Sequence, residues 1–574
     1  MAANTDIATD IITFDILTQG IKTNTLCSLK SIVVNKEANK IAYAQLILFD
    51  SGEIKDGFTI SDTDDFIPGN TIEIKAGYHF KNTTVFKGII IKHGIRRTTS
   101  RFEIIIDCKH PAVTMTVCQK SNYFYNAKDS DIAAKLVNPY GIALQATPTK
   151  VTHKAMVQHR VSDWEFMLMR AEANGLLVHT DDDALKIIAP ETSNNPVLNL
   201  DPGSIMEIES EMDALTQLKA VSAAAWDSAA QKVIKTEAVS PKFSEQGNID
   251  AGVLAGVTKH TTYEMPHTGN LDDTELQARA DAKLLKSRLA KIRGRIKCQG
   301  NADIRTGDTV RIDGIGKRFN GPVYITGVRH QINSKNWETD LQFGLAPESY
   351  GASTVREQNH NLVPPISGLQ IGVVVQLQDD PLGEDRILVR APMVSENEPG
   401  IWARINCLDA GKNRGTFFRP EIGDEVVLGF IDNDPRYPMV LGMLNSSARP
   451  APLKASDKNP EKGFVTKEAL KLLFNDETKG IAMETPNGNL IIMSDEDGGI
   501  SLKDENGNSV LMNADGITLE SSKDLILKAQ GDITMEGMNT EIKAGAELKA
   551  EGSAGAEISA GGNTVIKGAM VMIN

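Results

Sequence analysis

The 574-residue chain lacks the cysteine pattern of a disulfide-bonded or zinc-binding protein. Its five cysteines are odd in number, lie far apart and form no Cys-x-x-Cys pair: Cys27, Cys108, Cys118, Cys298 and Cys407. We therefore expect reduced thiols in the core. Reduced cysteines are typical of proteins that fold in a cytosol.

The chain also lacks a secretory or membrane-spanning segment. Residues Met1–Asp10 contain no positively charged start followed by an apolar stretch, and no run reaches the ~18 apolar residues of a transmembrane helix. A formal net charge of −14 argues against nucleic acid or an anionic membrane as the main partner. We expect synthesis in the cytoplasm, with any export carried out by another machine.

Catalytic motifs are missing as well. No Gly-x-Ser-x-Gly, His-Glu-x-x-His or Gly-x-x-x-x-Gly-Lys-Ser/Thr pattern occurs, so neither a nucleophile elbow, a zinc helix nor a phosphate loop is predicted. The four carboxylates within residues 379–385 could form an acid–base pair, but Pro381 and Gly383 among them favour an exposed turn.

Two histidines raise the possibility of a metal site. His153 and His159 lie close to Asp163 in the sequence, but nothing in the pattern places them on one face, so we interpret them as surface residues. The sequence thus predicts no catalytic, cofactor-binding or metal-binding residue.

What the chain does contain is a short unit repeated from about Ile481 to Asn574. Two apolar residues flank a third that is usually polar, as in Ile500 and Leu502, and a Gly, Asn or Asp turn follows. Between positions 517 and 533 the step settles to eight residues, which predicts strand, turn, strand. Each strand offers one narrow apolar edge that a single chain cannot cover. We expect an intertwined oligomeric β-helix.

The N-terminal part reads as strands interrupted by helices. Runs such as Thr71–Tyr78 and Phe102–Cys108 predict a β-domain. Ser162–Glu165 is a capping box whose helix Gly175 ends.

Further along, a second capping box and an internal echo appear. Thr274–Gln277 is predicted to open an amphipathic helix that Gly294 ends. Pro68–Ile74 resembles Thr306–Ile312, since each is a turn with Gly second and then an alternating strand. The echo indicates either two duplicated barrels or two unrelated hairpins, because Gly-Asn and Gly-Asp turns are common.

Proline-rich segments separate the C-terminal modules. Residues 346–368 and 446–479 are predicted linkers, and Thr466–Phe474 within the second is predicted to form a short helix. Between them, residues 369–445 form a compact β-module.

That module resembles the oligonucleotide-binding-like (OB-like) barrel of VgrG spike proteins and phage baseplate spikes. The resemblance rests on Arg419-Pro-Glu-Ile-Gly-Asp-Glu-Val-Val427 with residues further on: Phe430, Asp434, Pro435, Pro438, Gly442 and Asn445. We take as structural signature residues Arg419, Pro420, Gly423, Asp424, Glu425, Asp434, Pro435, Pro438, Gly442 and Asn445. Upstream, Val161–Phe166 and Asn320–His330 are similar to the phage tail-hub and late-control D family.

The resemblance implies a mainly β fold with this order: a first hub barrel (1–120), a helical segment (121–200), a second hub barrel with a helix (201–345), a linker (346–368), an OB-like barrel (369–445), a linker with a short helix (446–479) and an intertwined trimeric β-helix needle (480–574). Three chains would then supply six hub barrels, which matches a three-fold spike to a six-fold tube.

Three differences between this sequence and members of the family narrow the domains and partners that we expect. Residues 446–474 are too few for the lysozyme domain that some phage spikes insert, and no effector domain is expected after Asn574. No His-x-His pair for an apical iron occurs. A separate tip protein of the PAAR-repeat type is therefore implied, docked on Met570, Met572, Ile573 and Asn574.

The function expected from the resemblance is structural. The chain would be the homotrimeric central spike of a contractile injection system, bound to inner-tube and baseplate proteins, with no cofactor and no nucleic acid, and touching the target membrane only on puncture. A free phage-tail-like particle is favoured by the compact length; the alternatives are a type VI secretion VgrG or a phage tail spike. A receptor-binding fibre would need an aromatic-rich head, and a wall-degrading spike would need a catalytic acid.

Overall fold

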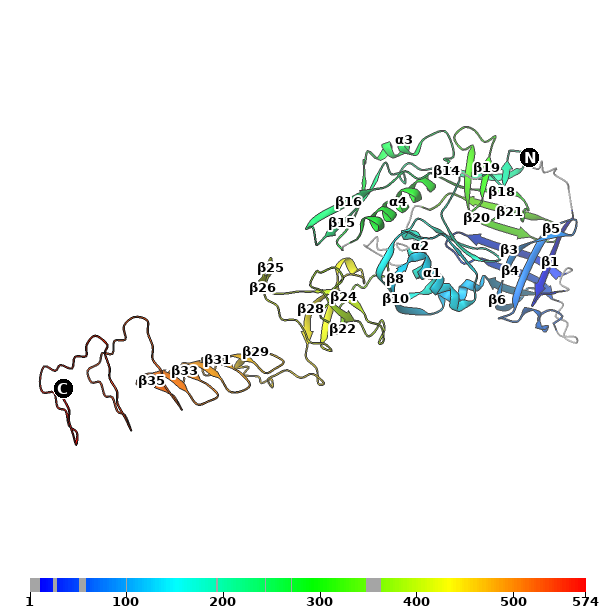
Figure 1. The fold of residues 1–574 in the computed structure, drawn as a ribbon. Helices are drawn as coiled ribbons and strands as arrows, with labels where there is room; N and C mark the ends of the chain where they lie inside the picture. Colours follow the sequence, from blue (N-terminus) through cyan, green and yellow to red (C-terminus); the bar gives the residue numbers. More distant parts are fainter. Residues whose placement is uncertain are drawn as a thin grey trace. The chain divides into compact units, whose positions relative to one another are not determined.

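The computed structural model describes residues 11–23, 28–50, 58–99, 101–192, 195–242, 244–269, 271–346 and 363–573. It divides into two compact units, Met1–Arg449 and Pro450–Asn574. Figure 1 shows strands in both units and the helices α1 to α4 in the first. We call residues 11–346 the hub, residues 369–445 the barrel and residues 461–573 the needle.

One sheet of thirteen strands runs through the hub in the order β14-β18-β21-β20-β3-β4-β7-β6-β5-β1-β2. Off this path, β19 pairs with β20, and β13 pairs with β19. These strands are β1 (Ile12–Thr18), β2 (Ile21–Lys22), β3 (Leu29–Glu37), β4 (Tyr43–Asp50), β5 (Thr71–Tyr78), β6 (Lys81–Arg97), β7 (Phe102–Lys109), β13 (Leu198–Leu200), β14 (Ile205–Met212), β18 (Ile292–Gln299), β19 (Thr309–Ile312), β20 (Gly321–Ile332) and β21 (Trp337–Phe343). Because β3 pairs with β20, strands of both predicted hub barrels belong to one continuous sheet.

Each half of this sheet nevertheless keeps its own core. Alternate residues of β3, β4 and β7 point inward, and Ile32, Leu46 and Ile104 are fully buried there. A separate cluster around Ile296 and Leu341 fills the second half. Period-two burial is what a sheet with one covered face requires.

The internal echo has the same backbone geometry in both halves. Gly69 and Gly307 adopt φ of 105° and 97°. The Gly69 N–H donates to the Ile90 carbonyl at 2.8 Å, and the Gly307 N–H donates to the Ile325 carbonyl at 2.8 Å. Each acceptor isoleucine returns a 2.9 Å bond to the residue after its glycine, and a bulge follows in each strand. Of the two interpretations, this shared pattern favours duplication.

The first two helices of the hub lie among short strands between residues 119 and 188. The strands around them are β8 (Gln119–Lys128), β9 (Leu144–Ala146), β10 (Thr152–Ser162), β11 (Leu177–Thr180) and β12 (Leu185–Ile188), with helices α1 (Asp129–Val137) and α2 (Asp163–Ala173). The capping box at α2 is confirmed, because the Glu165 N–H donates to Ser162 Oγ and the Ser162 N–H donates to the Glu165 carboxylate. Gly175 follows with φ 68°.

The second predicted capping box is wrong in its position. Helix α4 (Asp273–Leu289) is capped by Asp272, whose carboxylate accepts from the Glu275 N–H at 2.8 Å. Gly294 lies inside β18 and does not end the helix. Strands β15 (Val221–Asp227), β16 (Lys232–Glu237) and β17 (Tyr263–His267) and helix α3 (Ala251–Ala255) complete the hub, with α4 packed on β15.

The barrel closes from five strands, as the resemblance implies. The ring runs β22 (Gln370–Gln376), β23 (Ile387–Arg390), β24 (Ile401–Ile405), β28 (Pro438–Leu444) and β27 (Glu425–Phe430). Its interior holds Val374, Ile387, Val389, Val426 and Leu428, all nearly inaccessible to solvent.

The needle begins as an antiparallel meander of seven strands: β29 (Glu461–Val465), β30 (Lys471–Asn475), β31 (Gly480–Glu484), β32 (Leu490–Ser494), β33 (Gly499–Lys503), β34 (Ser509–Asn513) and β35 (Gly516–Glu520). The helix predicted over Thr466–Phe474 is wrong. Residues 466–470 are a turn closed by a 2.9 Å bond from the Thr466 N–H to the Leu470 carbonyl, and β30 follows.

The same five-residue turn recurs twice, from Thr485 to Asn489 and from Asp504 to Asn508, with closing bonds of 3.0 and 3.1 Å. Residues 471–489 and 490–508 are tandem copies, offset by 19 positions (490 − 471), and both end in Asn-Gly-Asn. The meander is therefore built from a repeating two-strand unit.

Residues 521–573 differ from the meander. No strand is formed within this described segment, and all but one of its side chains are exposed. Exposed aliphatic residues such as Leu525, Ile533 and Ile542 recur along it. In an intertwined β-helix the strands of one chain pair with strands of the other chains. One chain taken alone would then show such a segment without strands.

Candidate functional site: the barrel signature, the joint and the needle face

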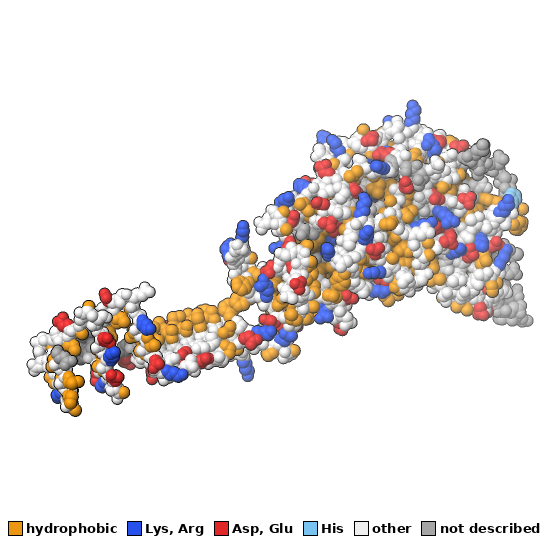
Figure 2. All heavy atoms as spheres, viewed as in Figure 1, with side chains coloured by type: hydrophobic (Ala, Val, Ile, Leu, Met, Phe, Trp, Pro, Cys, Tyr) orange, Lys and Arg blue, Asp and Glu red, His pale blue; other side chains and the backbone are white. Residues whose placement is uncertain are grey.

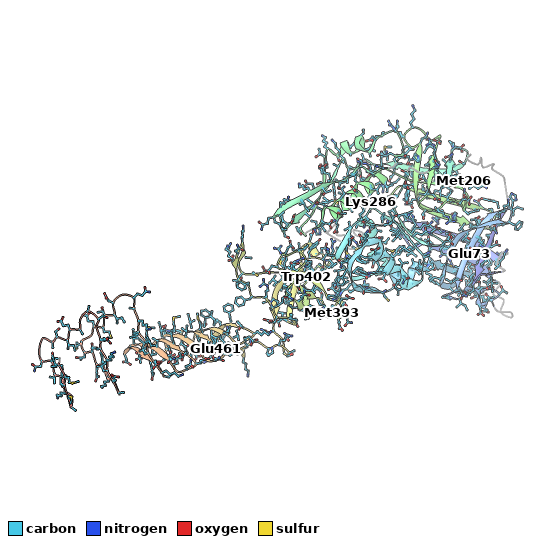
Figure 3. The ribbon with its side chains drawn as sticks, viewed as in Figure 1. Glu73, Met206, Lys286, Met393, Trp402 and Glu461 are labelled. Carbon is cyan, nitrogen blue, oxygen red and sulfur yellow. The ribbon has the colours of Figure 1, made fainter. Side chains whose placement is uncertain are left out.

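The barrel signature divides into two structural roles. Its first part forms a tight turn before β27. The Gly423 N–H donates to the Val374 carbonyl at 2.8 Å with φ 87°, and the Asp424 carboxylate accepts from the Glu421 N–H at 2.8 Å. The turn therefore ties β27 to β22. Trp402, labelled in Figure 3, lies on β24 of the same barrel.

The remaining members of this part sit around the turn and along β28. Arg419 pairs with Asp385 at 2.5 Å on the surface, and Pro420 is buried. Glu425 begins β27, and Pro438 and Gly442 lie within β28. Asn445 directly follows β28.

The second part of the signature, Asp434-Pro435, leads into a buried cluster of charges. Asp434 is only 1% exposed. The Arg436 guanidinium donates to Asp434 at 2.8 Å and to Glu275 at 2.7 Å. Glu275 belongs to the first turn of α4. One arginine of the barrel thus bridges its own loop and a hub helix.

The cluster continues into the hub. Arg170 of α2 donates to Asp129 of α1 through Nε at 2.7 Å and Nη2 at 2.9 Å. His153 of β10 lies 3.1 Å from Asp129 and 3.8 Å from Glu275. We call this set the joint: Asp129, His153, Arg170, Glu275, Asp434 and Arg436.

The joint fixes how the barrel meets the hub. Its carboxylates and guanidiniums are all at least nine-tenths buried, where an unpaired charge would cost several kcal/mol. Any tilt of the barrel that separated Arg436 from Glu275 would break the buried 2.7 Å bond that joins the barrel loop to α4. The ion pairs therefore favour one orientation.

Local charges determine the protonation of the joint. Burial alone would raise the pKa of the Asp434 carboxyl, but the Arg436 charge and the neighbouring His267 outweigh it and hold that pKa well below its usual range. Burial is likewise outweighed at Asp129, where Arg170 and His153 lower the pKa. The Glu275 pKa is lowered by Arg436, His153 and Arg170 against the same burial effect.

These depressed pKa values predict acid sensitivity. A carboxyl whose folded pKa lies below its unfolded value stabilises the fold above the unfolded pKa of about 4, and this contribution is lost as the pH falls toward the folded pKa. We expect the unfolding temperature to change little between pH 7 and 5 and to drop steeply below about pH 4. Calorimetry across this range checks it.

A matched pair of variants makes the acid test specific. Asp129→Asn should unfold more easily at pH 7 but show a flatter dependence on pH than the parent chain. Asp409→Asn, which alters an exposed ion pair with Arg414, should keep the parent's dependence. Equal slopes for all three proteins would contradict a role for the joint in acid sensitivity.

Sequence reasoning missed most of the joint. The signature predicts Asp434 only as a structural residue of the barrel and gives no role to Arg436, two positions further on. The surface interpretation of His153 and His159 is wrong, because they are 5% and 7% exposed. The position of Arg436 directly after the Asp434-Pro435 turn was the available signal for it. Nothing local pointed to Glu275, which lies 161 positions away.

The needle meander has one face that is apolar except for Lys462 at its start. Cross-strand register aligns two columns on it. One column holds Phe464, Leu472, Met483, Ile491, Leu502, Val510 and Leu519; the other holds Phe474, Ile481, Met493, Ile500, Met512 and Ile517. Figure 2 shows apolar side chains running along this unit. The opposite face alternates apolar with polar residues such as Ser501 and Thr518.

This face is too apolar to be left in water. Met483, Met493 and Leu519 are 49%, 42% and 59% exposed in the single chain. Contiguous exposed apolar surface of this kind marks an interaction site. The predicted tip residues Met570, Met572 and Ile573 are also strongly exposed, and Asn574 lies outside the described residues.

The other candidate sites suggested by the sequence are not formed by the described residues. In the described ranges no group of three or more His, Cys, Asp and Glu side chains could hold a metal. The carboxylates of residues 379–385 sit in a turn, where Asp380 is bound by Arg386 at 2.6 Å. None of the helices described is long and apolar enough to cross a membrane.

The cysteine prediction is half right. Cys108 and Cys298 are buried free thiols, and burial raises the pKa of Cys298 to about 12. Cys118 and Cys407 are exposed, contrary to the prediction, and Cys27 lies outside the described residues.

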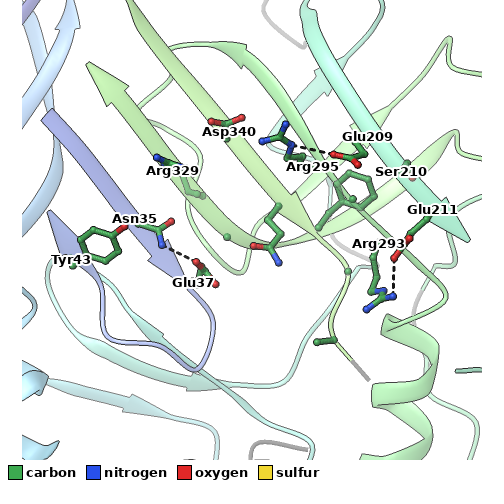
Figure 4. A pocket seen from close by; sticks show the side chains of 17 residues that line it. Asn35, Glu37, Tyr43, Glu209, Ser210, Glu211, Arg293, Arg295, Arg329 and Asp340 are labelled. Carbon is green, nitrogen blue, oxygen red and sulfur yellow. Dashed lines mark hydrogen bonds and ion pairs between the residues drawn. The ribbon is translucent and has the colours of Figure 1, made fainter. Parts of the chain in front are cut away.

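One hollow of the hub lies over a charged sheet face, drawn in Figure 4. Glu209 and Glu211 of β14 pair across the sheet with Arg295 and Arg293 of β18, at 3.5 and 2.8 Å. Opposite charges on adjacent strands neutralise one another. The face therefore offers no concentrated charge to a ligand.

Three family matches cover most of the chain. Residues 8–334 match the family described as the Alg8 N-terminal domain, residues 370–444 match the type VI secretion system/phage-baseplate injector OB domain, and residues 480–574 match the phage baseplate V C-terminal trimerisation domain.

Individual relatives are more distant. The type VI secretion system spike protein VgrG1b of Pseudomonas aeruginosa is 24% identical over 212 residues, which are 34% of this chain and 28% of VgrG1b. VgrG1c of the same organism is 32% identical over 98 residues, 16% of this chain and 13% of the relative. The matched region thus spans less than a third of these curated relatives.

Solved structures support the fold. A chain of the half-lidded Francisella PdpA–VgrG complex superposes with a TM-score of 0.54 at 11% identity, covering 89% of this chain and 87% of that one. A chain of the lidless PdpA–VgrG complex gives 0.51 at 10% identity, covering 89% and 98%.

Proposed function

Since the chain belongs to the Alg8 N-terminal domain family and is a VgrG-like spike protein, we propose that it is the homotrimeric central spike of a contractile injection system. It would be assembled into the baseplate of a phage-tail-like particle and driven into a target envelope when the sheath contracts. The observation that carries the proposal is the apolar needle face, which one chain leaves uncovered, inside a region that matches a trimerisation domain.

The needle acts mechanically. Three copies packed through their apolar columns would bury these side chains in a shared interior, and strands of residues 521–573 would pair between copies. Axial load would then be distributed over many backbone hydrogen bonds, with no long exposed edge. No bond is made or broken, so the protein is not an enzyme under this proposal.

In this proposal the hub matches the three-fold symmetry of the needle to the six-fold symmetry of the inner tube. The duplicated turn at Gly69 and Gly307 supports two equivalent halves per chain, so three chains present six halves to a six-fold inner tube. Inner-tube and baseplate proteins are the partners proposed for the hub. A PAAR-type tip protein is the partner proposed for the exposed Met570, Met572 and Ile573.

A type VI secretion apparatus is the second candidate setting. It is favoured by one specific observation, the match of the barrel to an injector domain shared by that system and phage baseplates. Both settings require the same trimeric needle.

The test combines mass and delivery. Light scattering should give about three times the chain mass of 62.3 kDa, because the needle faces are buried only between copies. A chain truncated before Gly488 should remain soluble, since the first unit ends at Arg449, but should no longer support killing or injection by the assembled particle. A monodisperse full-length monomer, or full delivery by the truncated chain, would refute the proposal.

A further inference from the structure

A small projecting hairpin leaves the barrel between β24 and β27. Residues 407–418, which we call the arm, contain strands β25 (Ala410–Gly411) and β26 (Arg414–Gly415), paired with each other. In Figure 1 they stand away from the barrel body. The Arg414 guanidinium donates hydrogen bonds of 2.6 and 2.7 Å to the two carboxylate oxygens of Asp409. These bonds within the arm stabilise its conformation.

The arm carries large apolar side chains into solvent. Leu408 is 97% exposed and Phe417 is 79% exposed. A hollow of about 480 Å³ lies beside them against the barrel. A preorganised loop with exposed leucine and aromatic residues has the composition of an interface anchor.

The same barrel has a second apolar area on the outer side of β22, β27 and β28. Ile371 stands opposite Val427, which stands opposite Gly442. Ile371 and Leu441 are 44% and 43% exposed. We call this area the shelf: Ile371, Val427, Leu441 and Gly442.

Gly442 is the informative residue of the shelf. A Cβ placed on it would meet nothing within 4 Å, and its φ is not in the left-handed region. Neither backbone conformation nor crowding within the chain therefore requires glycine here. Glycine inside a strand weakens it and often marks a bulge or a place where another backbone approaches closely. Gly442 borders the bulge at Leu441, and its missing side chain leaves the outer side of β28 open there.

We infer that in the trimer the arm of each copy docks on the shelf of the next copy. This inference rests on the proposed trimer and adds a second contact outside the needle. A three-fold ring needs a head-to-tail interface, in which each subunit offers two different complementary patches. The barrel has two such patches, the arm and the shelf. Only residues 445–460 separate β28 from the first needle strand, so a trimeric needle would keep three barrels at high local concentration.

A disulfide trap tests the contact in the full chain. Cys118 and Cys407, which are exposed among the described cysteines, and Cys27 are first replaced by serine. Phe417→Cys with Leu441→Cys should then give covalent dimers and trimers on non-reducing gels after mild oxidation. Phe417→Cys with Met393→Cys is the matched control, because Met393 is 68% exposed on the same barrel (Figure 3) but lies outside the shelf.

Each result decides the matter. Linked trimers in the first variant and none in the control support the contact. A disulfide within one chain, or unlinked chains in a sample whose native mass is trimeric, overturns it and assigns the arm to another protein, while leaving the proposed spike intact. A monomeric native mass would overturn the spike proposal and this contact together.

Discussion

Replacing Ile500 by lysine is expected to abolish the trimer. Ile500 lies in the middle of one apolar column of the needle, directly opposite Met493 on one side and Met512 on the other. In a trimer three lysines would enter one shared interior, each without a counter-ion and close to the other two. Burying an unpaired charge costs several kcal/mol even after relaxation, and the effect is multiplied by three.

The measurement is native mass. Light scattering or analytical ultracentrifugation should show a fall from about three chains to one chain of 62.3 kDa. The hub and barrel should keep their thermal transition, since they form a separate compact unit. That second readout separates loss of assembly from general misfolding.

Ser501→Lys is the matched control. Ser501 is the next residue of the same strand and points to the opposite face, where it pairs with Leu511 and Ile492. A lysine there keeps its ammonium group in water, so the mass should stay trimeric. If Ile500→Lys also remained trimeric, the apolar columns would not be the interior of an assembly.

Local patterns predicted those parts of the fold whose signals lie within a few residues. The capping box at Ser162 and the strand repeat after Ile481 each depend on neighbours in the chain. The repeat was predicted to start too late, because its first turn, Thr466–Leu470, lacks the Asn-Gly that marks the other two turns. With leucines at 470, 472 and 473 it read as a short helix.

The joint could not be predicted because its energy comes from pairs that are far apart in sequence. Arg436 meets Glu275 only after the barrel docks on α4, and Arg170 meets Asp129 across two helices. The 19-residue repeat of the needle, in contrast, was present in the sequence. Aligning 471–489 with 490–508 would have placed β30 correctly.

Removing Arg436 from the joint is expected to cause the largest loss of stability in the hub and barrel. Arg436→Met keeps the volume of the side chain but leaves Asp434 and Glu275 buried without their common partner. Breaking a buried pair in this way costs about 3–5 kcal/mol, which lowers the unfolding temperature by about 3–5 °C in a unit of this size. Differential scanning calorimetry of the full chain measures it.

The control and the rescue make this prediction specific. Arg414→Met removes an exposed pair with Asp409, worth about 0–1 kcal/mol, and should barely change the transition. Adding Glu275→Gln and Asp434→Asn to Arg436→Met removes the orphaned charges, so the triple variant should be more stable than Arg436→Met alone. If Arg436→Met unfolded at the parent temperature, the barrel would be held to the hub by its apolar contacts. Its orientation under load would then not depend on the ion pairs.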